Sequence, residues 1–311
     1  MKIVVAGGTG FLGAPLCGSW ADEGHEVLVL TRGLGPGQRQ HEPGTGVPGV
    51  TRVGWKPSDG AEPLVSTIEG ATAVVNLAGE SIDAKRWTEA RKQVIRNSRL
   101  DATRALAAAI RSCATPPGTF ISGSAVGYYG DRGGEMIAED APPGRDFLAR
   151  LCADWEEQAQ AAARPGVRIV VVRTGIVLER SGGALPRMML PFRYFTGGPL
   201  GSGRQYLSWI HRLDWIETIR WAIDTPAAAG PFNATAPHPV TNREFARALG
   251  RAMHRPAIAP GVPHVVLRLA VGEIADSLVT GQRAVPAKAL AAGFHFRYPE
   301  IDIALRGIFE T

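Results

Sequence analysis

Short apolar runs recur along the first half of the chain, and several of them are followed by a segment with helical spacing. The apolar runs lie at residues 3–6, 27–30, 50–55, 73–79, 119–122 and 167–172. Apolar residues at helical spacing follow at residues 11–23, 80–110 and 146–163. This alternation predicts the α/β class, with a doubly wound parallel sheet and helices on both of its faces.

The first apolar run leads into a glycine-rich turn. Gly7, Gly10 and Gly13 have the G-x-x-G-x-x-G spacing, and Phe11 and Leu12 lie between the last two. In a strand–turn–helix unit the first glycine permits a sharp turn, the second lets a diphosphate approach the backbone, and the third allows close packing. The helix that follows presents free N–H groups to an anion. The turn therefore predicts a dinucleotide site.

The residues after the second apolar run indicate which dinucleotide binds. A carboxylate at this place would bind the ribose 2′-hydroxyl of NAD, but the chain has Thr31 and Arg32 here. Arg32 can pair with a 2′-phosphate, and Thr31 adds a hydroxyl donor. The alternative is a solvated turn arginine. The prediction is NADP(H).

Later runs end in small or polar residues that should meet at the same edge of the sheet. Small side chains there let a dinucleotide come close to the backbone. The further cofactor-binding residues that we expect are Leu77, Ala78, Gly79, Ser122, Arg173, Thr174 and Gly175.

The chain becomes rich in glycine and proline from residue 179. We expect residues 1–178, joined again by 206–235, to form the dinucleotide domain. Residues 179–205 and 236–311 should form a smaller substrate lobe. Within that lobe the capping-box spacing of Thr241–Glu244 predicts the start of a helix.

Three residues near the entrance to the second lobe are candidate substrate contacts. Arg204, Gln205 and Trp209 follow a glycine-rich loop. An arginine and a glutamine beside a tryptophan can hold an anionic or polar ring. The alternative is a hinge between the lobes.

Composition and charge narrow the range of partners. The 311 residues carry a formal net charge of +5, with a pI near 9.4, but the basic residues are scattered. We therefore expect no nucleic acid as a partner. The three cysteines have no metal-binding spacing, so we expect no metal and a reducing compartment.

Two further observations concern location. The first strand is predicted to begin at residue 2, so we expect no signal peptide, and no apolar run has the length of a membrane span. We expect a cytoplasmic protein with a small-molecule substrate and no membrane partner. A homodimer is left open.

Motifs along nearly the whole chain identify a family. They include Gly7–Gly13, Asn76–Glu80, Ser98-Arg99, Ser122–Gly130, Trp155-Glu156, Arg173–Gly175, Gly201–Gln205 and Ser208–His211. In this order they resemble the extended or atypical short-chain dehydrogenases/reductases, and most closely the "epimerase family" proteins of the nucleoside-diphosphate-sugar-epimerase type. The resemblance implies a Rossmann fold, NADP(H) binding and a small C-terminal substrate lobe.

The resemblance also implies a reaction in which a hydride moves between nicotinamide and a carbonyl or alcohol carbon. A tyrosine exchanges the proton, a lysine four positions later tunes that tyrosine, and a serine binds the substrate oxygen. Ser124 stands at the serine position. The tyrosine and lysine positions fall at Leu148 and Cys152, and neither side chain can replace them.

Three interpretations follow from this departure. In the first, Tyr128 or Tyr129 supplies the proton beside Ser124. In the second, the acid or base is Glu80, Cys152 or His211. In the third, the protein binds NADPH without turnover and acts as a sensor or regulator. The sequence favours an oxidoreductase or epimerase with non-standard acid/base residues over the non-catalytic alternative.

Overall fold

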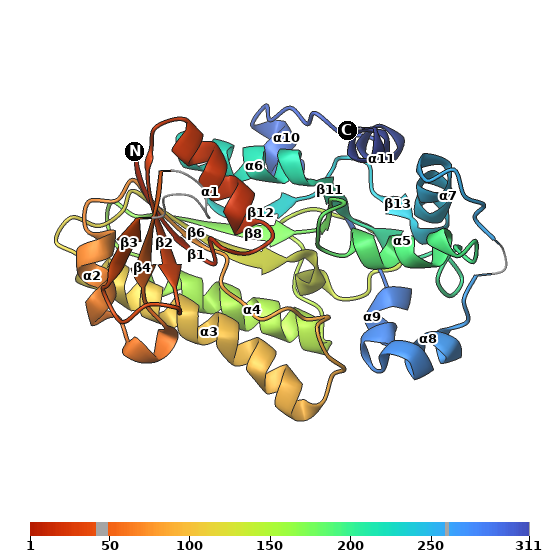
Figure 1. The fold of residues 1–311 in the computed structure, drawn as a ribbon, viewed down its shortest axis with the longest axis horizontal. Coiled ribbons are helices and arrows are strands. Elements are labelled where there is room, and N and C mark those ends of the chain that lie inside the picture. Colours follow the sequence, from red (N-terminus) through yellow and green to blue (C-terminus); the bar gives the residue numbers. More distant parts are fainter. Residues whose placement is uncertain (42–48, 259–260, 311) are drawn as a thin grey trace.

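The computed structural model describes residues 1–41, 49–258 and 261–310, and in this part of the chain one large sheet organises the fold (Figure 1). The sheet has eight strands, which run parallel except for β3. Their spatial order is β12 (Gly230–Ala234), β8 (Arg168–Thr174), β6 (Thr119–Ala125), β5 (Ala73–Asn76), β1 (Lys2–Ala6), β2 (Glu26–Thr31), β4 (Val50–Gly54) and β3 (Arg39–His41). The predicted Rossmann-type α/β fold is confirmed.

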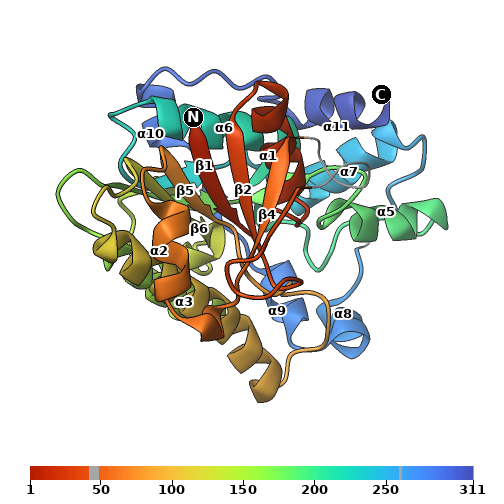
Figure 2. The ribbon, with the colours of Figure 1, turned by 60° about the vertical axis from the view of Figure 1, so that its left-hand side comes forward.

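Helices cover both faces of this sheet, as Figures 1 and 2 show. One face packs against α1 (Gly13–Asp22) and α6 (Arg212–Asp224); the other packs against α2 (Glu62–Ile68), α3 (Glu89–Ser112) and α4 (Phe147–Gln160). Strand β1 shows why both faces are apolar. Ile3 and Val5 lie in the first core and Val4 in the second, because successive strand residues point to opposite faces.

The order of the strands reverses beside β1. The chain proceeds from β1 to β2 and β4 on one side, then returns to β5 and continues to β6, β8 and β12 on the other. The turns after β1 and β5 meet there, since a Cβ on Gly7 would lie 2.7 Å from the carbonyl carbon of Leu77. Ligands of open α/β sheets bind in the crevice at such a reversal.

A smaller set of elements packs beside the sheet. These are β9 (Ile176–Leu178) with β11 (Trp209–His211), β10 (Tyr206–Leu207) with β13 (Val240–Thr241), and α5 (Leu185–Arg193), α7 (Asn242–Ala252), α8 (His264–Val271), α9 (Ile274–Val279) and α11 (Ile301–Phe309). Helix α7 begins with the predicted capping box, in which Thr241 and Glu244 satisfy each other's backbone N–H groups.

Part of the C-terminal segment packs against the main sheet and not against this smaller set of elements. Helix α10 (Ala287–Ala291) packs against β12, and Ala289 lies in the core of the main sheet. The short strand β14 (Arg283–Ala284) pairs with β7 (Met136–Ile137), while η1 (Pro57–Asp59) and η2 (Val126–Tyr129) are single 3₁₀ turns. In the described residues no helix has both the length and the apolarity that a membrane span requires.

The helix expected over residues 80–110 begins later, at Glu89. Thr88 caps it by accepting a hydrogen bond from the backbone N–H of Arg91. Residues 80–88 form a loop, and Trp87 is buried because its indole Nε1 donates to the carbonyl of Ile82 and its ring packs on Phe147. Trp87 therefore fits helical spacing in the sequence although it is a buried residue of a loop. The glycine- and proline-rich segment after residue 179 in turn contains α5, which the sequence did not predict.

Candidate functional site

The glycine turn after β1 has the geometry of an anion-binding turn. Gly7 has φ +81°, a conformation that side chains rarely adopt, and a Cβ on Gly13 would lie 2.2 Å from the carbonyl oxygen of Gly7. Gly10 is exposed, and its N–H donates to that carbonyl at 3.0 Å. The first turn of α1 has no acidic side chain, so an anion would meet only N–H groups and the positive end of the helix.

Phe11 connects this turn to the second set of elements. Its ring lies against Gly182 and Gly183, where an added Cβ would come within 2.5 and 2.8 Å of the ring. The Arg212 guanidinium lies 5.8 Å from the ring centroid on another side. Phe11 therefore packs the segment after β9 onto the glycine turn.

The turn after β5 lies directly against the glycine turn. Asn76 is buried, and its amide donates to Thr103 Oγ1 and accepts from the backbone N–H of Ala78. These bonds hold the backbone of Leu77 and Ala78, which are half-buried, and leave Gly79 exposed. The turns after β1 and β5 thus lie side by side, with Gly10 and Gly79 exposed.

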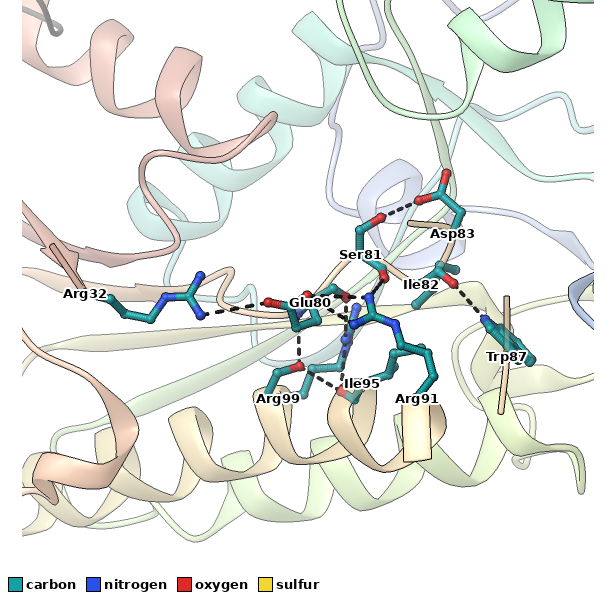
Figure 3. A network of polar contacts seen from close by, with 10 residues as sticks. Arg32, Glu80, Ser81, Ile82, Asp83, Trp87, Arg91, Ile95 and Arg99 are labelled. Carbon is teal, nitrogen blue, oxygen red and sulfur yellow. Dashed lines mark hydrogen bonds and ion pairs between the residues drawn. The ribbon is translucent and has the colours of Figure 1, made fainter. Parts of the chain in front are cut away.

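Arg32 lies at the end of β2 with its side chain 78% exposed. Figure 3 shows it extended toward Glu80, whose Oε1 is 3.9 Å from Arg32 Nη1. The other carboxylate oxygen of Glu80 is 3.4 Å from Arg91 Nη1, and Arg91 also donates to the carbonyl of Ser81. Glu80 is thus an ion-pair partner of two arginines, and Arg32 keeps most of its surface open to a ligand.

Ser124 is the second-last residue of β6 and belongs to a buried polar network. Its Oγ donates to Glu156 Oε1 at 2.6 Å. Arg173 is 3% exposed and donates to both oxygens of Glu156, from Nε at 2.9 Å and from Nη2 at 2.8 Å. Burial disfavours the charge of Arg173, but the Glu156 carboxylate outweighs it and raises the pKa of the guanidinium. The network is a closed ion pair behind Ser124, which is itself 5% exposed.

The two tyrosines of η2 have different surroundings. Tyr129 has no exposed surface, and its hydroxyl donates to Asn233 Oδ1 at 2.7 Å and accepts from Arg173 Nη1 at 2.9 Å. Burial raises the pKa of Tyr129 to about 12. Tyr128 is half-buried with Arg173 3.5 Å from its ring centroid, and its hydroxyl bonds to none of the described residues. Of the two hydroxyls, that of Tyr128 is available to a ligand.

Helix α4 brings Leu148 and Cys152 beside Ser124 and η2. A Cβ on Gly127 would lie 3.4 Å from Leu148 Cβ, so position 148 faces the 3₁₀ turn. Cys152 is buried, and burial raises the pKa of its thiol to about 11. A neutral buried thiol is a poor proton acceptor, and this environment does not suit Cys152 for the role of base.

His211 and Trp209 do not open onto a groove. His211 Nδ1 accepts the backbone N–H of Leu213 and caps α6, and its ring stacks on Tyr298 at 3.8 Å. Burial lowers the pKa of His211 to about 4. Trp209 is 1% exposed, with its indole Nε1 bonded to the carbonyl of His238. Trp209 belongs to the core of the smaller set of elements, and both side chains make these contacts within the fold.

Gln205 and Arg204 also lie differently from each other. Gln205 is buried, and its Nε2 donates to the carbonyls of Leu200 and Leu278, so it connects a loop to α9. Arg204 is exposed. Of the three expected substrate contacts, Arg204 alone projects its side chain to the surface.

Three other expected cofactor contacts are part of the framework. Ser122 has no exposed surface. Thr174 Oγ1 accepts the indole N–H of Trp215, and a Cβ on Gly175 would lie 2.4 Å from the Ser208 carbonyl oxygen. Ser122 is thus enclosed within β6, whereas Thr174 and Gly175 are half-buried at the end of β8.

The sequence did not reveal the roles of Glu156 and Asn233. The position of Glu156 can be inferred once strand pairing is known. Ser124 and Arg173 are direct partners in the β6–β8 register, and a carboxylate on the covering helix can reach both. Asn233 lies on β12, next to Arg173 in the neighbouring register. That contact depends on which strand pairs with β8, which local spacing does not show.

Comparison with known proteins agrees with this geometry. The model of the "NAD dependent epimerase/dehydratase family" matches residues 3–235, and a domain of unknown function, DUF1731, matches residues 262–308. The chain is 40% identical over 306 residues to epimerase family protein YfhF of Bacillus subtilis, covering 98% of this chain and 97% of that protein. It is 40% identical over 316 residues to epimerase family protein SDR39U1 of mouse, covering 99% of each.

A solved structure is similar over the whole chain. Human epimerase family protein SDR39U1, crystallised with NADPH, superposes with a TM-score of 0.87 at 35% identity, with 100% of both chains covered. A nucleoside-diphosphate sugar epimerase from Corynebacterium glutamicum superposes with a TM-score of 0.77 at 31% identity, and this chain covers 58% of that one.

Proposed function

The chain belongs to the NAD dependent epimerase/dehydratase family, and we propose that it binds NADPH and exchanges a hydride between this cofactor and a carbonyl or alcohol carbon. The observation that carries the cofactor is Arg32, an exposed cation at the end of β2 where an NAD site would have a carboxylate. The glycine turn and the exposed Gly79 provide room for a dinucleotide. The relative solved with NADPH supports the choice.

The bound cofactor supplies the hydride, and side chains of this protein manage the proton. Tyr128 is the proposed proton donor in the reduction direction, because its hydroxyl has no partner among the described residues and it lies one 3₁₀ turn from Ser124. Ser124 donates to Glu156 and keeps lone pairs that can accept from the substrate or from Tyr128. Arg173 positions both groups, since it holds Glu156 and lies against the Tyr128 ring.

A second candidate function is NADPH binding without turnover. It is favoured by Leu148 and Cys152, which occupy the positions where the family resemblance implies tyrosine and lysine. Such a protein would act as a sensor of the reduced cofactor. Epimerisation is a third form of the hydride chemistry, in which the cofactor stays bound and is regenerated.

The test combines NADPH with a panel of carbonyl compounds and nucleotide sugars and follows the absorbance of the reduced nicotinamide. We expect turnover with at least one class, and a loss of about 10²- to 10⁴-fold in kcat for Tyr128→Phe. Tyr194→Phe is the matched control, because Tyr194 is exposed at the end of α5. Wild-type activity in Tyr128→Phe would remove Tyr128 from the mechanism. Tight NADPH binding with no turnover across the panel would favour the sensor, and tightly co-purified cofactor would favour the epimerase.

A further inference from the structure

Arg99 is a half-buried cation beneath the turn after β5. It projects from α3 toward the segment after β5, as Figure 3 shows. Its guanidinium lies 5.3 Å from the Trp155 ring centroid, and a Cβ on Gly79 would be 3.1 Å from Arg99 Cζ. Nη1 donates to the carbonyls of Glu80 and Ile95, at 2.9 and 3.1 Å. The guanidinium is therefore fixed between an aromatic face and the backbone of the cofactor-side turn.

The charge of Arg99 has no close counterion among the residues that the structure describes. In the part of the chain that the structure describes, no carboxylate lies within ion-pair distance of it. The Glu80 carboxylate is near enough to favour its charge, but Glu80 is directed to Arg32 and Arg91. Burial lowers the pKa of Arg99. Two carbonyl oxygens satisfy Nη1 but do not neutralise the charge, so the guanidinium keeps further N–H donors and a net charge for an anion.

We infer that Arg99 binds an anionic group in the groove between the ends of β5 and β6. A guanidinium suits phosphate and carboxylate oxygens, to which it can donate two parallel hydrogen bonds. Arg99 lies beneath the exposed Gly79, and the Trp155 ring that supports it also packs against Gly123, next to Ser124. The anion is therefore the diphosphate of the dinucleotide or an anionic group of the substrate. The diphosphate as the source of the anion rests on the proposed function, in which the protein binds NADPH.

The first arm of the test measures NADPH affinity by fluorescence titration. Arg99→Met removes the charge and keeps an unbranched side chain, and Arg99→Lys keeps the charge without the planar fork. The matched control is Arg104→Met on the same helix, because Arg104 is exposed and pairs with Asp101. If the anion is the diphosphate, Arg99→Met should weaken NADPH binding about tenfold or more. Arg99→Lys should lose less and Arg104→Met almost nothing.

The second arm tests the substrate source. Inorganic phosphate and malonate are titrated into protein saturated with NADPH, and the thermal midpoint is followed. If the anion belongs to the substrate, these probes should raise the midpoint of the wild type and of Arg104→Met but not of Arg99→Met, while NADPH affinity stays unchanged.

The inference is overturned if Arg99→Met behaves like Arg104→Met in both arms. If Arg99→Met does not fold, Arg99→Gln takes its place, because its amide can still donate to a carbonyl. Absence of NADPH binding by the wild type would contradict the proposed function instead. The second arm, repeated without cofactor, would then still measure what Arg99 does.

Discussion

Two groups of arginines lie near the carboxyl ends of the sheet strands, and they differ in how their charge is balanced. Arg173 donates to both oxygens of Glu156, to the Tyr129 hydroxyl and to the Glu139 carbonyl, so all its nitrogens are used within the protein. Arg32 is mostly exposed, and among the described residues Arg99 contacts two backbone carbonyls and the Trp155 ring but no carboxylate within ion-pair distance. The closed arginine holds the fold together, whereas the open ones are available to a ligand. Substitutions at the first should change stability, and substitutions at the second should change binding.

The largest effect should come from breaking the buried ion pair between Arg173 and Glu156. Arg173→Met leaves the Glu156 carboxylate enclosed without its partner, and we expect a loss of about 3–5 kcal/mol in the free energy of unfolding. Urea denaturation measures it. The control is Arg251→Met, which removes an exposed pair with Asp302 and should cost about 0–1 kcal/mol. Similar losses in both variants would contradict the distinction.

His211 is also enclosed within the protein, and its titration should make the free energy of unfolding depend on pH. Its pKa falls from 6.5 in the unfolded chain to about 4 in the fold, because burial disfavours the imidazolium. The unfolded state therefore binds more protons between these values, so this contribution is complete above about pH 6.5 and is lost as pH falls through about 4. It amounts to at most about 3 kcal/mol. His211→Asn keeps a capping acceptor for α6 and should flatten that part of the curve of unfolding free energy against pH. An unchanged acid slope in the variant would refute the assignment.

For the exposed Arg32, the substitution Arg32→Asp should weaken NADPH binding by about 10- to 100-fold. It removes a charge-assisted contact and adds repulsion toward the 2′-phosphate. NADH binding and the unfolding midpoint should change little, since Arg32 is exposed. Parallel titrations with the two cofactors measure the difference. Equal weakening of both would mean that Arg32 does not recognise the 2′-phosphate.

The smallest effect should follow from Glu80→Gln. This carboxylate is 3.9 Å from Arg32, and removing its charge frees the guanidinium for the cofactor. An exposed pair of this kind contributes less than about 1 kcal/mol, so NADPH affinity should rise only a few-fold. The same titration with NADH is the control and should not change. A fall in NADPH affinity would indicate that Glu80 holds Arg32 in its binding position.

What the sequence predicted well depends on local chemistry. The glycine turn, the alternation of strands and helices, and the Thr241–Glu244 cap all follow from spacing within a few residues, and the structure has each of them. Helix α5 was missed because Pro186 and Pro191 suggest a loop, although the first of them stands in the first turn, where the missing N–H is not needed.

The parts that the sequence did not predict depend on distant contacts. The sequence did not predict the ion pair of Arg173 with Glu156, because this pair forms only when α4 covers β6 and β8. In the same way, Tyr128 and Tyr129 are neighbours in sequence and differ only in what the fold places around each hydroxyl. Residue type and spacing do not encode that difference.

The return of α10 to the main sheet has a consequence for synthesis of the protein. Glu139 Oε1 accepts the backbone N–H groups of both Asn233 and Lys288, and Asn233 donates its amide to the Val285 carbonyl. On the ribosome, the strands from β1 to β12 emerge before the segment that seals their edge. Until residue 288 has left the exit tunnel, the nascent chain has an uncovered sheet edge beside Phe232, a surface that invites aggregation and chaperone binding.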